Sequence, residues 1–449
     1  MNSLPVPLWR QLQAAASVLA AVRQGESTSP ALARLDMALR PAAQALAFQA
    51  LRNLGRAEAL RCLLANRPPP PAADALLCTA LALAWNPQDT PYEAFTLVDQ
   101  TVEAAKRDRA ARGQANFINA CLRRFLRERE PLLAATDRDP VARWNHPLWW
   151  IERLQADHPE HWEDILRVNN VQAPMTLRVF DRKLPRAEYL RTLADAQMPA
   201  SPVGRYGVLL HRPRPVHEIP GFDQGVVSVQ DAAAQLAAPL LLDGLVRGGK
   251  PLRVLDACAA PGGKTAHLLE IADLAVTALE IDPVRCERIH DTLRRIGLQA
   301  AVVAADAAQP QGWWDGVPFD AILLDAPCTA SGIVRRHPDV RWLRRASDSA
   351  QLAAQQARLL AALWPLLAAG GRMLFCTCSV FRAEGEAQMQ TFVAHNKDAV
   401  LRPAPGHFLP RSGVKGSGVP DNPESDHDGF FYALLEKRSA PAGQAPQAA

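Results

Sequence analysis

The second half of the chain alternates five short apolar runs with helical segments, and this alternation constrains the fold more than any other feature. The runs have the length of β-strands and read RVLDACA, AVTALEID, AAVVAAD, FDAILLDAP and GGRMLFCTCSV. Helical segments such as VRCERIHDTLRRIG and QLAAQQARLLAALWPLL lie between them. Because such strands pair in parallel through right-handed crossovers, the pattern predicts a doubly wound α/β domain that binds its ligand beyond the carboxyl ends of the strands.

The first half has a different organisation. Residues 8–130 are rich in alanine and leucine at helical spacing, so we expect an all-helical module, in which RPPPPA at 67–72 is a stiff connection. Further on, MTLRVF, GVLLHR and GVVSVQD have strand length and accompany a helical AEYLRTLADAQ. The predicted domains are a helical module at 1–140, a small α+β connector at 141–235, the α/β domain at 236–437 and a disordered tail at 438–449.

Composition excludes several classes of protein. Hydrophobic residues make up 48% of the 449 residues, but no apolar run is long enough to cross a bilayer, so we expect a cytoplasmic protein without a membrane partner. The eight cysteines are irregularly spaced and include no C-x-x-C pair, which argues against a disulfide framework and a zinc site; we predict no metal. A net charge of +4 permits nucleic-acid binding without requiring it.

The stretch DACAAPGGKT resembles a phosphate-binding loop at first sight. A P-loop has the pattern G-x-x-x-x-G-K-[ST], which places its first glycine at position 258, and this position is Cys258. The sequence therefore argues against a nucleotide hydrolase. The dinucleotide pattern G-x-G-x-x-G is absent as well, which disfavours a dinucleotide cofactor.

Acidic residues stand at the ends of four predicted strands: Asp256, Glu280, Asp306 and Asp325. A carboxylate at the end of the second strand of such a sheet commonly accepts hydrogen bonds from ribose hydroxyls, a role that suits Glu280. The glycines at 262–263 let the backbone approach a ligand closely. Taken alone, Glu280 is also compatible with a strand-capping carboxylate without a ligand, and the glycines are also compatible with a plain turn. Taken together, the carboxylate and the glycines favour an adenosine-bearing ligand.

Two cysteines also follow predicted strands. Cys328 lies in DAPCTASG and Cys378 in CTCS, so both thiols are expected at the same edge of the sheet. The alternative is that the two cysteines are inert thiols buried in the core. A thiolate nucleophile needs nearby positive charge, and residues 335–345, RRHPDVRWLRR, carry five arginines and one aspartate. These arginines are interpreted either as a solvated helix face or as phosphate contacts that also assist the thiol.

The motifs DACAAPGGKT, LEID, DAPCTASG, RRHP and TCSV, in this order, resemble those of the RNA cytosine-C5 methyltransferases of the NOL1/NOP2/Sun family. ANFINACLRRFLRERE, RWNHPLWWIERLQADHPEHW, GFDQGVVSVQDAAAQ and DGFFYALLEK further resemble bacterial members that act on 16S rRNA and have a NusB-like N-terminal part. The resemblance covers residues 5–437. It implies a NusB-like RNA-binding module, a connector that takes part in RNA recognition, and a Rossmann-like methyltransferase domain dependent on S-adenosyl-L-methionine.

The resemblance also assigns roles to residues. It implies that 16S rRNA is the partner and that Cys378 is the nucleophile, Cys328 assists release of the product and Asp325 contacts the base. Glu280 stands where the family usually has aspartate. The implied cofactor-binding residues are Cys258, Ala259, Ala260, Pro261, Gly262, Gly263, Lys264, Glu280, Asp306 and Asp325.

The chemistry of cytosine explains a requirement for two thiols. Carbon 5 is a poor nucleophile until a thiolate adds to carbon 6, and a base must later remove the carbon-5 proton so that the thiolate can leave. The residues alone leave open which cysteine has which role; the assignment follows from the resemblance. The target base must be unstacked to reach such a pocket.

The sequence is compatible with other functions as well. The basic stretch at 106–129 is the outer face of a bundle helix or an RNA-docking surface, and the resemblance favours docking. A methyltransferase acting on protein or a small molecule would not need paired strand-end cysteines. A non-catalytic RNA-binding or assembly factor would not need the complete motifs. We expect a monomer.

Overall fold

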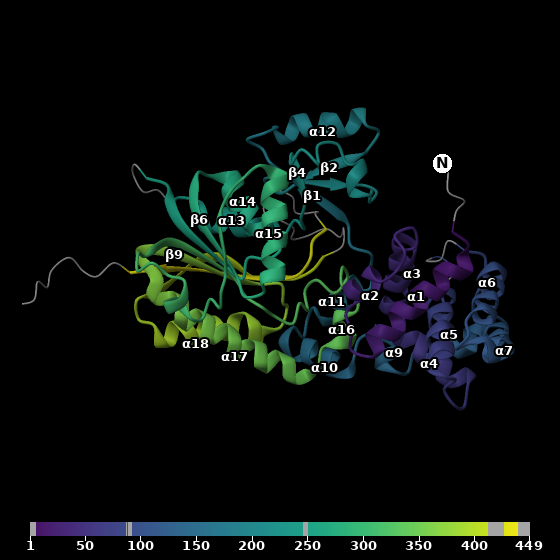
Figure 1. Cartoon of the computed structure of the whole chain (residues 1–449). Helices are drawn as coiled ribbons and strands as arrows, with labels where there is room; N and C mark the ends of the chain where they lie inside the picture. Colours follow the sequence, from purple (N-terminus) through teal and green to yellow (C-terminus); the bar gives the residue numbers. More distant parts are fainter. Residues whose placement is uncertain (1–5, 87, 89–91, 246–249, 412–425, 439–449) are drawn as a thin grey trace, which may run out of the picture. The chain divides into compact units, whose positions relative to one another are not determined.

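The computed structural model describes residues 6–86, 88, 92–245, 250–411 and 426–438 (Figure 1). The chain divides into two compact units. The first comprises residues 1–172 together with 334–346, and the second comprises residues 173–333 and 347–449. Residues 439–449, most of the predicted disordered tail, lie outside the described part.

The first unit is helical within its described residues, as predicted for most of its length. Helix α5, rich in alanine and leucine, is almost entirely buried and packs against α1, α3 and α4. Helix α4 ends at Leu64, before the proline run at 68–71, and the last proline of the run is the first residue of α5, where a backbone N–H is not needed. The larger helices of this unit are α1 (Leu8–Arg23), α3 (Arg40–Arg52), α4 (Leu54–Leu64), α5 (Pro71–Ala84), α6 (Ala94–Arg107), α7 (Ala115–Arg127), α8 (Arg129–Thr136), α10 (Leu148–Asp157) and α11 (Trp162–Asn169).

The arginine-rich segment 334–346 is part of this helical unit, although it follows the fourth strand of the α/β domain in sequence. It contains the short helix α16 (Val340–Leu343). The Arg341 guanidinium is fully buried and donates to the carbonyls of Asn145 and Asn169, at 3.0 and 2.6 Å. The prediction of a solvated face or of phosphate contacts is therefore wrong for Arg341. Its guanidinium instead satisfies carbonyls that a fold without this segment would leave unpaired.

The connector within the second unit is a four-stranded antiparallel sheet with the order β2-β3-β1-β4. Its predicted strands are confirmed as β1 (Met175–Val179), β3 (Gly207–Leu210) and β4 (Val227–Val229), and its predicted helix is α12 (Arg186–Asp195). The additional strand β2 (Ala200–Val203) was not predicted, because Pro202 and its polar neighbours do not have the apolar pattern of a strand.

The α/β domain has a seven-stranded sheet with the order β10-β11-β9-β8-β5-β6-β7. The five predicted strands pair in parallel, as the alternation requires. Helices α13, α14 and α15 contribute to one of two buried apolar clusters, and α17 and α18 contribute to the other. These elements are α13 (Ala237–Leu242), β5 (Leu252–Ala257), α14 (Gly263–Ile271), β6 (Leu274–Glu280), α15 (Pro283–Ile296), β7 (Ala301–Ala304), β8 (Phe319–Asp325), α17 (Ala346–Leu363), β9 (Leu367–Thr377) and α18 (Glu386–His395).

Two C-terminal strands extend the sheet beyond the prediction. Strand β11 (Phe430–Lys437) pairs antiparallel with β9, and β10 (Ala399–Phe408) pairs antiparallel with β11. The sheet is therefore mixed rather than wholly parallel. Both faces of the buried strand β11 pack in the core, so its apolar run lacks the alternation that marks a surface strand.

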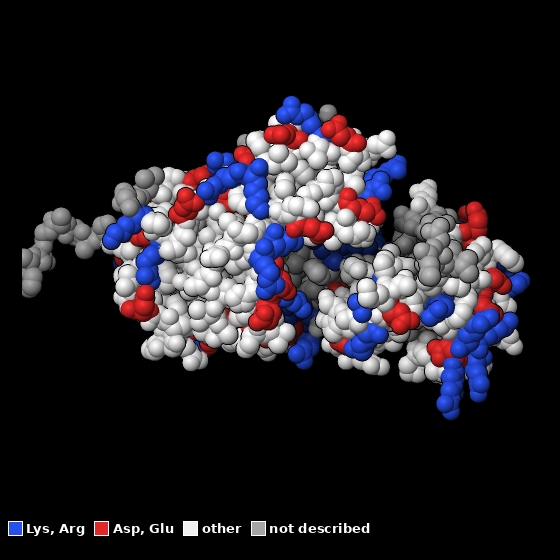
Figure 2. Space-filling view, turned by 45° about the horizontal axis from the view of Figure 1, so that its top comes forward, with Lys and Arg blue, Asp and Glu red and all other residues white. Residues whose placement is uncertain are grey.

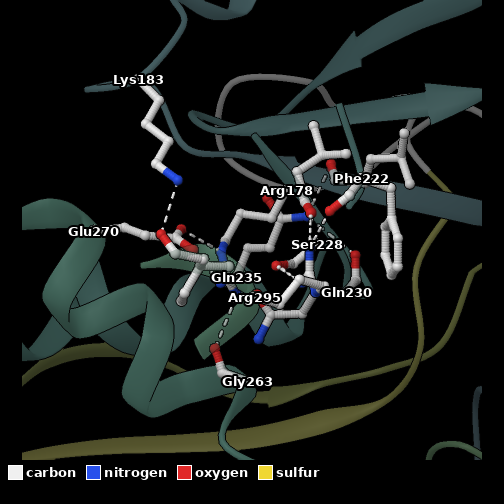
Figure 3. A network of polar contacts seen from close by, with 12 residues as sticks. Arg178, Lys183, Phe222, Ser228, Gln230, Gln235, Gly263, Glu270 and Arg295 are labelled. Atoms are coloured by element: carbon white, nitrogen blue, oxygen red, sulfur yellow. Dashed lines mark hydrogen bonds and ion pairs between the residues drawn. The ribbon is translucent and has the colours of Figure 1, made fainter. Parts of the chain in front are cut away.

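A polar network attaches the connector to helices α14 and α15 (Figure 3). Arg178 of β1 is fully buried, and its guanidinium donates to both carboxylate oxygens of Glu270, each at 2.7 Å. Nη1 of the same guanidinium donates to the carbonyl of Gly263 at 2.8 Å. On α15, Arg295 donates to the carbonyls of Phe222 and Val227. The connector therefore contacts α14 and α15, the two helices that follow strands β5 and β6.

Candidate active site

The ends of the parallel strands lie at one edge of the sheet. Register pairs Glu280 with Ala304 and Asp325 with Cys376, while Ala257 lies between Leu279 and Leu324. Parallel strands place their carboxyl ends together, so the acidic residues predicted at those ends share an edge.

The two predicted thiols face each other. The Sγ atoms of Cys328 and Cys378 are 3.4 Å apart. Backbone bonds hold their loops together: the amide of Ala326 donates to the Cys376 carbonyl and the amide of Gly332 donates to the Cys378 carbonyl, both at 2.9 Å. Two cysteines 50 residues apart in sequence thus lie within reach of one small ligand.

The environments of these thiols differ. The hydrogen bond with Cys378, together with burial, raises the pKa of the Cys328 thiol well above its usual value. Cys378 is only partly buried. Of the two, Cys328 is therefore suited to remain protonated and to donate its S–H to the Cys378 sulfur.

An ion pair stands beside the thiols. Lys264 Nζ, at the start of α14, lies 2.6 Å from Asp325 Oδ2 at the end of β8. Burial alone would lower the pKa of Lys264, but the Asp325 carboxylate that pairs with it raises the pKa above its usual value. The Cys376 thiol donates to Asp325 Oδ1 at 3.5 Å. A lysine, and not the arginine segment, thus provides the positive charge that pairs with Asp325 at this edge of the sheet.

The turn before α14 brings its backbone close to neighbouring elements. Gly262 has φ of +93°, and a Cβ there would lie 3.1 Å from the Cα of Ile289. Both facts require glycine. The buried Asp256 accepts a hydrogen bond from Thr265 Oγ1 at 2.6 Å, while its Oδ1 has no hydrogen-bond partner within the described residues. Burial raises the pKa of the neighbouring Cys258 thiol to about 12, so this cysteine is not a nucleophile at neutral pH.

Glu280 and Asp306 lie at the neighbouring strand ends. Glu280 is buried, and Arg285 Nη1 approaches its carboxylate at 3.2 Å. The Glu280 carbonyl accepts from the amide of Ala305, which places the Asp306 loop beside it. Asp306 closes its own turn, since its Oδ1 accepts from the amide of Ala308 at 2.9 Å. The two carboxylates are thus held at neighbouring strand ends.

Glu384 is a residue that sequence reasoning missed. Its carboxylate is fully buried and accepts hydrogen bonds from Thr329 and Ser379, the residues that follow the two cysteines. The available signal was a glutamate six residues after Cys378, but nothing in its surroundings, RAEGEA, distinguishes it from a helix-start carboxylate.

The basic stretch of the helical unit is largely exposed. Figure 2 shows Lys and Arg side chains projecting from this unit. Two carboxylates lie among them: Arg107 pairs with Glu103, and Arg124 and Arg127 both pair with Glu128. The exposed basic residues of this stretch are Lys106, Arg107, Arg109, Arg112, Arg123, Arg124 and Arg127.

Within the described residues, no helix is both long and apolar enough to span a membrane. In the same part of the chain, no group of three or more His, Cys, Asp or Glu side chains is arranged to hold a metal ion.

Comparison with known proteins identifies relatives of the whole chain. Residues 249–436 match the family model of the 16S rRNA methyltransferases RsmB/F, residues 146–217 match the ferredoxin-like domain of the RsmF/B-like methyltransferases, and residues 10–127 match the NusB family. Ribosomal RNA small subunit methyltransferase B of Pseudomonas putida is 41% identical, with 96% of this chain and 99% of the relative covered. The protein of the same name from Vibrio cholerae is 38% identical over 95% and 96%. The crystal structure of PH0851 shares the fold, with a TM-score of 0.72 and 23% identity over 97% of this chain and 99% of that one.

Proposed function

The chain belongs to the RsmB/F family of 16S rRNA methyltransferases, and we propose that it methylates carbon 5 of one cytosine in 16S rRNA with S-adenosyl-L-methionine, through a covalent bond between Cys378 and carbon 6. The observation that carries the finer part of this proposal is the 3.4 Å separation of the Cys328 and Cys378 sulfurs beside the Lys264–Asp325 pair. A methyltransferase acting on a more nucleophilic atom has no use for two adjacent thiols.

The residues at the strand ends fit an adenosine-bearing cofactor. Glu280 offers a buried carboxylate at the position where ribose hydroxyls bind in such sheets. Among the described residues, Oδ1 of Asp256 is a buried oxygen without a hydrogen-bond partner, and it lies near the end of β5, just before the turn. We assign cofactor binding to residues 258–264 with Glu280, Asp306 and Asp325. When bound, S-adenosyl-L-methionine supplies a methyl group on a positively charged sulfur, which makes the methyl carbon electrophilic.

In the proposed mechanism the Cys378 thiolate adds to carbon 6 of cytosine, and the electron pair of the C5–C6 double bond makes carbon 5 nucleophilic. The Asp325 carboxylate accepts a hydrogen bond from the cytosine amino group, while the Lys264 ammonium stabilises the negative charge that enters the ring. After carbon 5 carries the methyl group, it loses its proton to a base. The C5–C6 double bond then re-forms as the bond between carbon 6 and Cys378 breaks, which returns the thiolate. Cys328 assists this release.

The RNA must present an unstacked cytosine, since the thiols lie at the end of a sheet where a stacked base cannot reach them. We assign docking of the RNA to the exposed basic residues of the NusB-like module and to the ferredoxin-like connector, in a cytoplasmic enzyme that acts as a monomer. Within the described part of the chain, Lys106, Arg109, Arg112 and Arg123 form no ion pair, so they are suited to phosphate contacts.

Bisulfite sequencing of 16S rRNA tests the proposal. Cells that lack the gene are complemented with the wild-type chain or with Cys378→Ala, and unreactive cytosines are compared. The expected result is the loss of one protected cytosine, which only the wild-type chain restores. Unchanged protection at every cytosine would reject the proposed substrate.

A further inference from the structure

Glu384 joins the two loops that carry the thiols. We propose that it is a positioning residue that sets the separation between Cys328 and Cys378. The roles of the two thiols in this inference rest on the proposed function. The separation of the two sulfurs, in contrast, is a property of the protein without RNA or cofactor.

The Glu384 carboxylate binds the neighbour of each thiol. Oε1 accepts from the backbone amide of Thr329 at 2.8 Å, and Oε2 accepts from Ser379 Oγ at 2.6 Å. Thr329 Oγ1 donates to the same Oε2 at 2.5 Å. Thr329 follows Cys328 directly and Ser379 follows Cys378 directly. A single rigid group therefore links the chain one residue beyond each reacting sulfur.

The burial of the Glu384 carboxylate indicates a role besides filling space in the core. Glu384, Thr329 and Ser379 are all fully buried. A buried carboxylate costs several kcal/mol in lost hydration unless its hydrogen bonds replace the water, and an apolar side chain of similar volume would fill the same space without that cost. Unlike an apolar side chain, a satisfied polar network fixes the relative position of the segments that it joins.

Further contacts hold Glu384 itself in place. Its backbone carbonyl accepts from Thr377 Oγ1 at 3.2 Å. Gln356 of α17 donates to Glu384 Oε1 at 3.4 Å and to the carbonyl of Pro327, the residue before Cys328, at 2.9 Å. Helix α17 thus contacts both the Glu384 carboxylate and the residue before Cys328, while the Glu384 backbone contacts the last residue of β9.

The reaction requires such a fixed separation. In the proposed mechanism, Cys378 bonds to carbon 6 of the cytosine ring and Cys328 assists the release of Cys378, so both thiols act at one ring. A displacement of about 1 Å between reacting groups can reduce the rate on the order of 10²-fold. A shift of one loop relative to the other would therefore affect turnover before it affected binding of the cofactor.

The test measures the thiol separation and the turnover independently in the full chain. Glu384→Leu removes the acceptor, whereas Glu384→Gln keeps the shape and one acceptor oxygen. Gln388→Leu is the matched control, because Gln388 joins α18 to the Ala353 carbonyl at 2.7 Å without contacting either cysteine loop. Thr329→Val is a milder variant that removes the two hydrogen bonds of the Thr329 hydroxyl, to Glu384 and to Ser379, and keeps the bond from the Thr329 amide to Glu384.

The first measurement is the effective concentration of the two thiols. Each protein is equilibrated with a glutathione redox buffer, and the Cys328–Cys378 disulfide is quantified by peptide mass spectrometry. We expect Glu384→Leu to lower the effective concentration at least about tenfold, Thr329→Val to lower it less, and Gln388→Leu to leave it unchanged. Binding of S-adenosylhomocysteine shows that each variant is folded. If Glu384→Leu does not fold, Thr329→Val decides the question alone. An unchanged or increased effective concentration overturns the proposal.

The second measurement is steady-state methylation. We expect Glu384→Leu to lower kcat on the order of 10²-fold with KM for the cofactor unchanged, and Glu384→Gln to recover most of the loss. Loss of activity in Glu384→Gln equal to that in Glu384→Leu would assign Glu384 to proton transfer instead, and reject positioning. A wild-type chain that methylates no cytosine while Glu384→Leu still lowers the effective concentration would reject the proposed function and leave the positioning role supported.

Discussion

Lys264 Nζ lies 2.6 Å from Asp325 Oδ2, so the turn at the start of α14 is joined to the strand that leads to Cys328. The Lys264 side chain is 13% exposed and that of Asp325 is 28% exposed. The pair is thus shielded from most of the solvent, and its interaction is stronger than that of a surface ion pair. A base that entered here would meet both a hydrogen-bond acceptor and a positive charge.

Asp325→Asn should therefore affect the chemical step more than the binding of the cofactor. The substitution keeps the shape but removes the charge, and we expect kcat to fall by about 10²–10³-fold. Steady-state kinetics with the cofactor varied give the separate effects on kcat and KM. Asp306→Asn is the comparison, and we expect a higher KM for the cofactor with kcat at saturation nearly unchanged. The proposed role is wrong if Asp325→Asn raises only the KM.

The two thiols should give opposite phenotypes. Cys378→Ala should abolish both methyl transfer and the covalent bond to RNA while S-adenosylhomocysteine still binds. Cys328→Ala should let the covalent protein–RNA complex accumulate, because the step that releases Cys378 is slowed. Denaturing gel electrophoresis with 16S rRNA detects the complex. If Cys328→Ala lacks the complex and Cys378→Ala traps it, the two roles are reversed.

Asp256 should make the α/β domain less stable as the pH rises through neutrality. Burial raises the pKa of Asp256 from 3.8 to about 7. Between about pH 4 and 7 the folded protein therefore binds a proton that the unfolded chain releases, and the stability present below pH 4 is lost as the pH rises through 7. The full loss is at most about 4 kcal/mol.

Asp256→Asn can keep the hydrogen bond from Thr265 but does not titrate. We expect hydrogen exchange of peptides from β5 to show a stability that falls from pH 5 to 8 in the wild-type chain and stays nearly level in Asp256→Asn. Asp273→Asn, which alters a side chain that is 86% exposed, should leave the wild-type slope. Parallel slopes in wild type and Asp256→Asn would contradict the assigned burial.

The strand ends were predictable because the pattern of an α/β sheet is local in sequence. Each apolar run ends in a polar residue, and the rule for parallel sheets then brings Glu280, Asp325 and Cys378 to one edge without any knowledge of side-chain contacts. The C-terminal strands β10 and β11 were missed because Pro403, Pro405 and Gly406 interrupt the first of them, and because an antiparallel pair has no helix between its strands as a signal.

The buried charges were not predictable for a different reason. Charged side chains are usually exposed, so the sequence gives no signal that Arg341 and Glu384 are fully buried. Their partners come from distant parts of the chain: Arg341 binds carbonyls about 170 to 200 positions away, and Glu384 binds Thr329, 55 positions away. Contacts at such separations are determined by tertiary packing rather than by local pattern.

Arg341→Met should destabilise the helical unit. Arg341 is fully buried, and its removal leaves the carbonyls of Asn145 and Asn169 without this donor. We expect a loss of about 2–5 kcal/mol, since each buried acceptor left unpaired costs about 1–3 kcal/mol. Hydrogen exchange of peptides from α10 and α11 gives the local stability. Arg153→Met, at an exposed position of α10, removes the same kind of side chain and is the control; it should change the local stability by less than about 0.5 kcal/mol. Equal effects in both variants would show that the loss of a positive charge, and not of the buried contacts, destabilises the unit.

Arg178→Met should weaken the binding of the cofactor although Arg178 lies in the connector. Its guanidinium binds the first residue of α14 through the Gly263 carbonyl and binds Glu270 near the end of the same helix (Figure 3). Without the guanidinium, α14 loses its hydrogen bonds to β1 at both ends, and Glu270 remains as a buried carboxylate without its cation.

We expect the Kd for S-adenosylhomocysteine, measured by calorimetry on folded protein, to rise at least about tenfold in Arg178→Met. The matched control is Lys183→Met. Lys183 also joins the connector to the α/β domain, through the Ile296 carbonyl at 2.8 Å, but it contacts α15 rather than α14. A general loosening of the connector would raise the Kd in both variants, whereas a specific hold on the turn raises it in Arg178→Met alone. Only folded protein binds the ligand, so the Kd measured by calorimetry is that of the folded fraction. A Kd that stays unchanged while the melting temperature falls would therefore assign Arg178 to stability and not to the cofactor site.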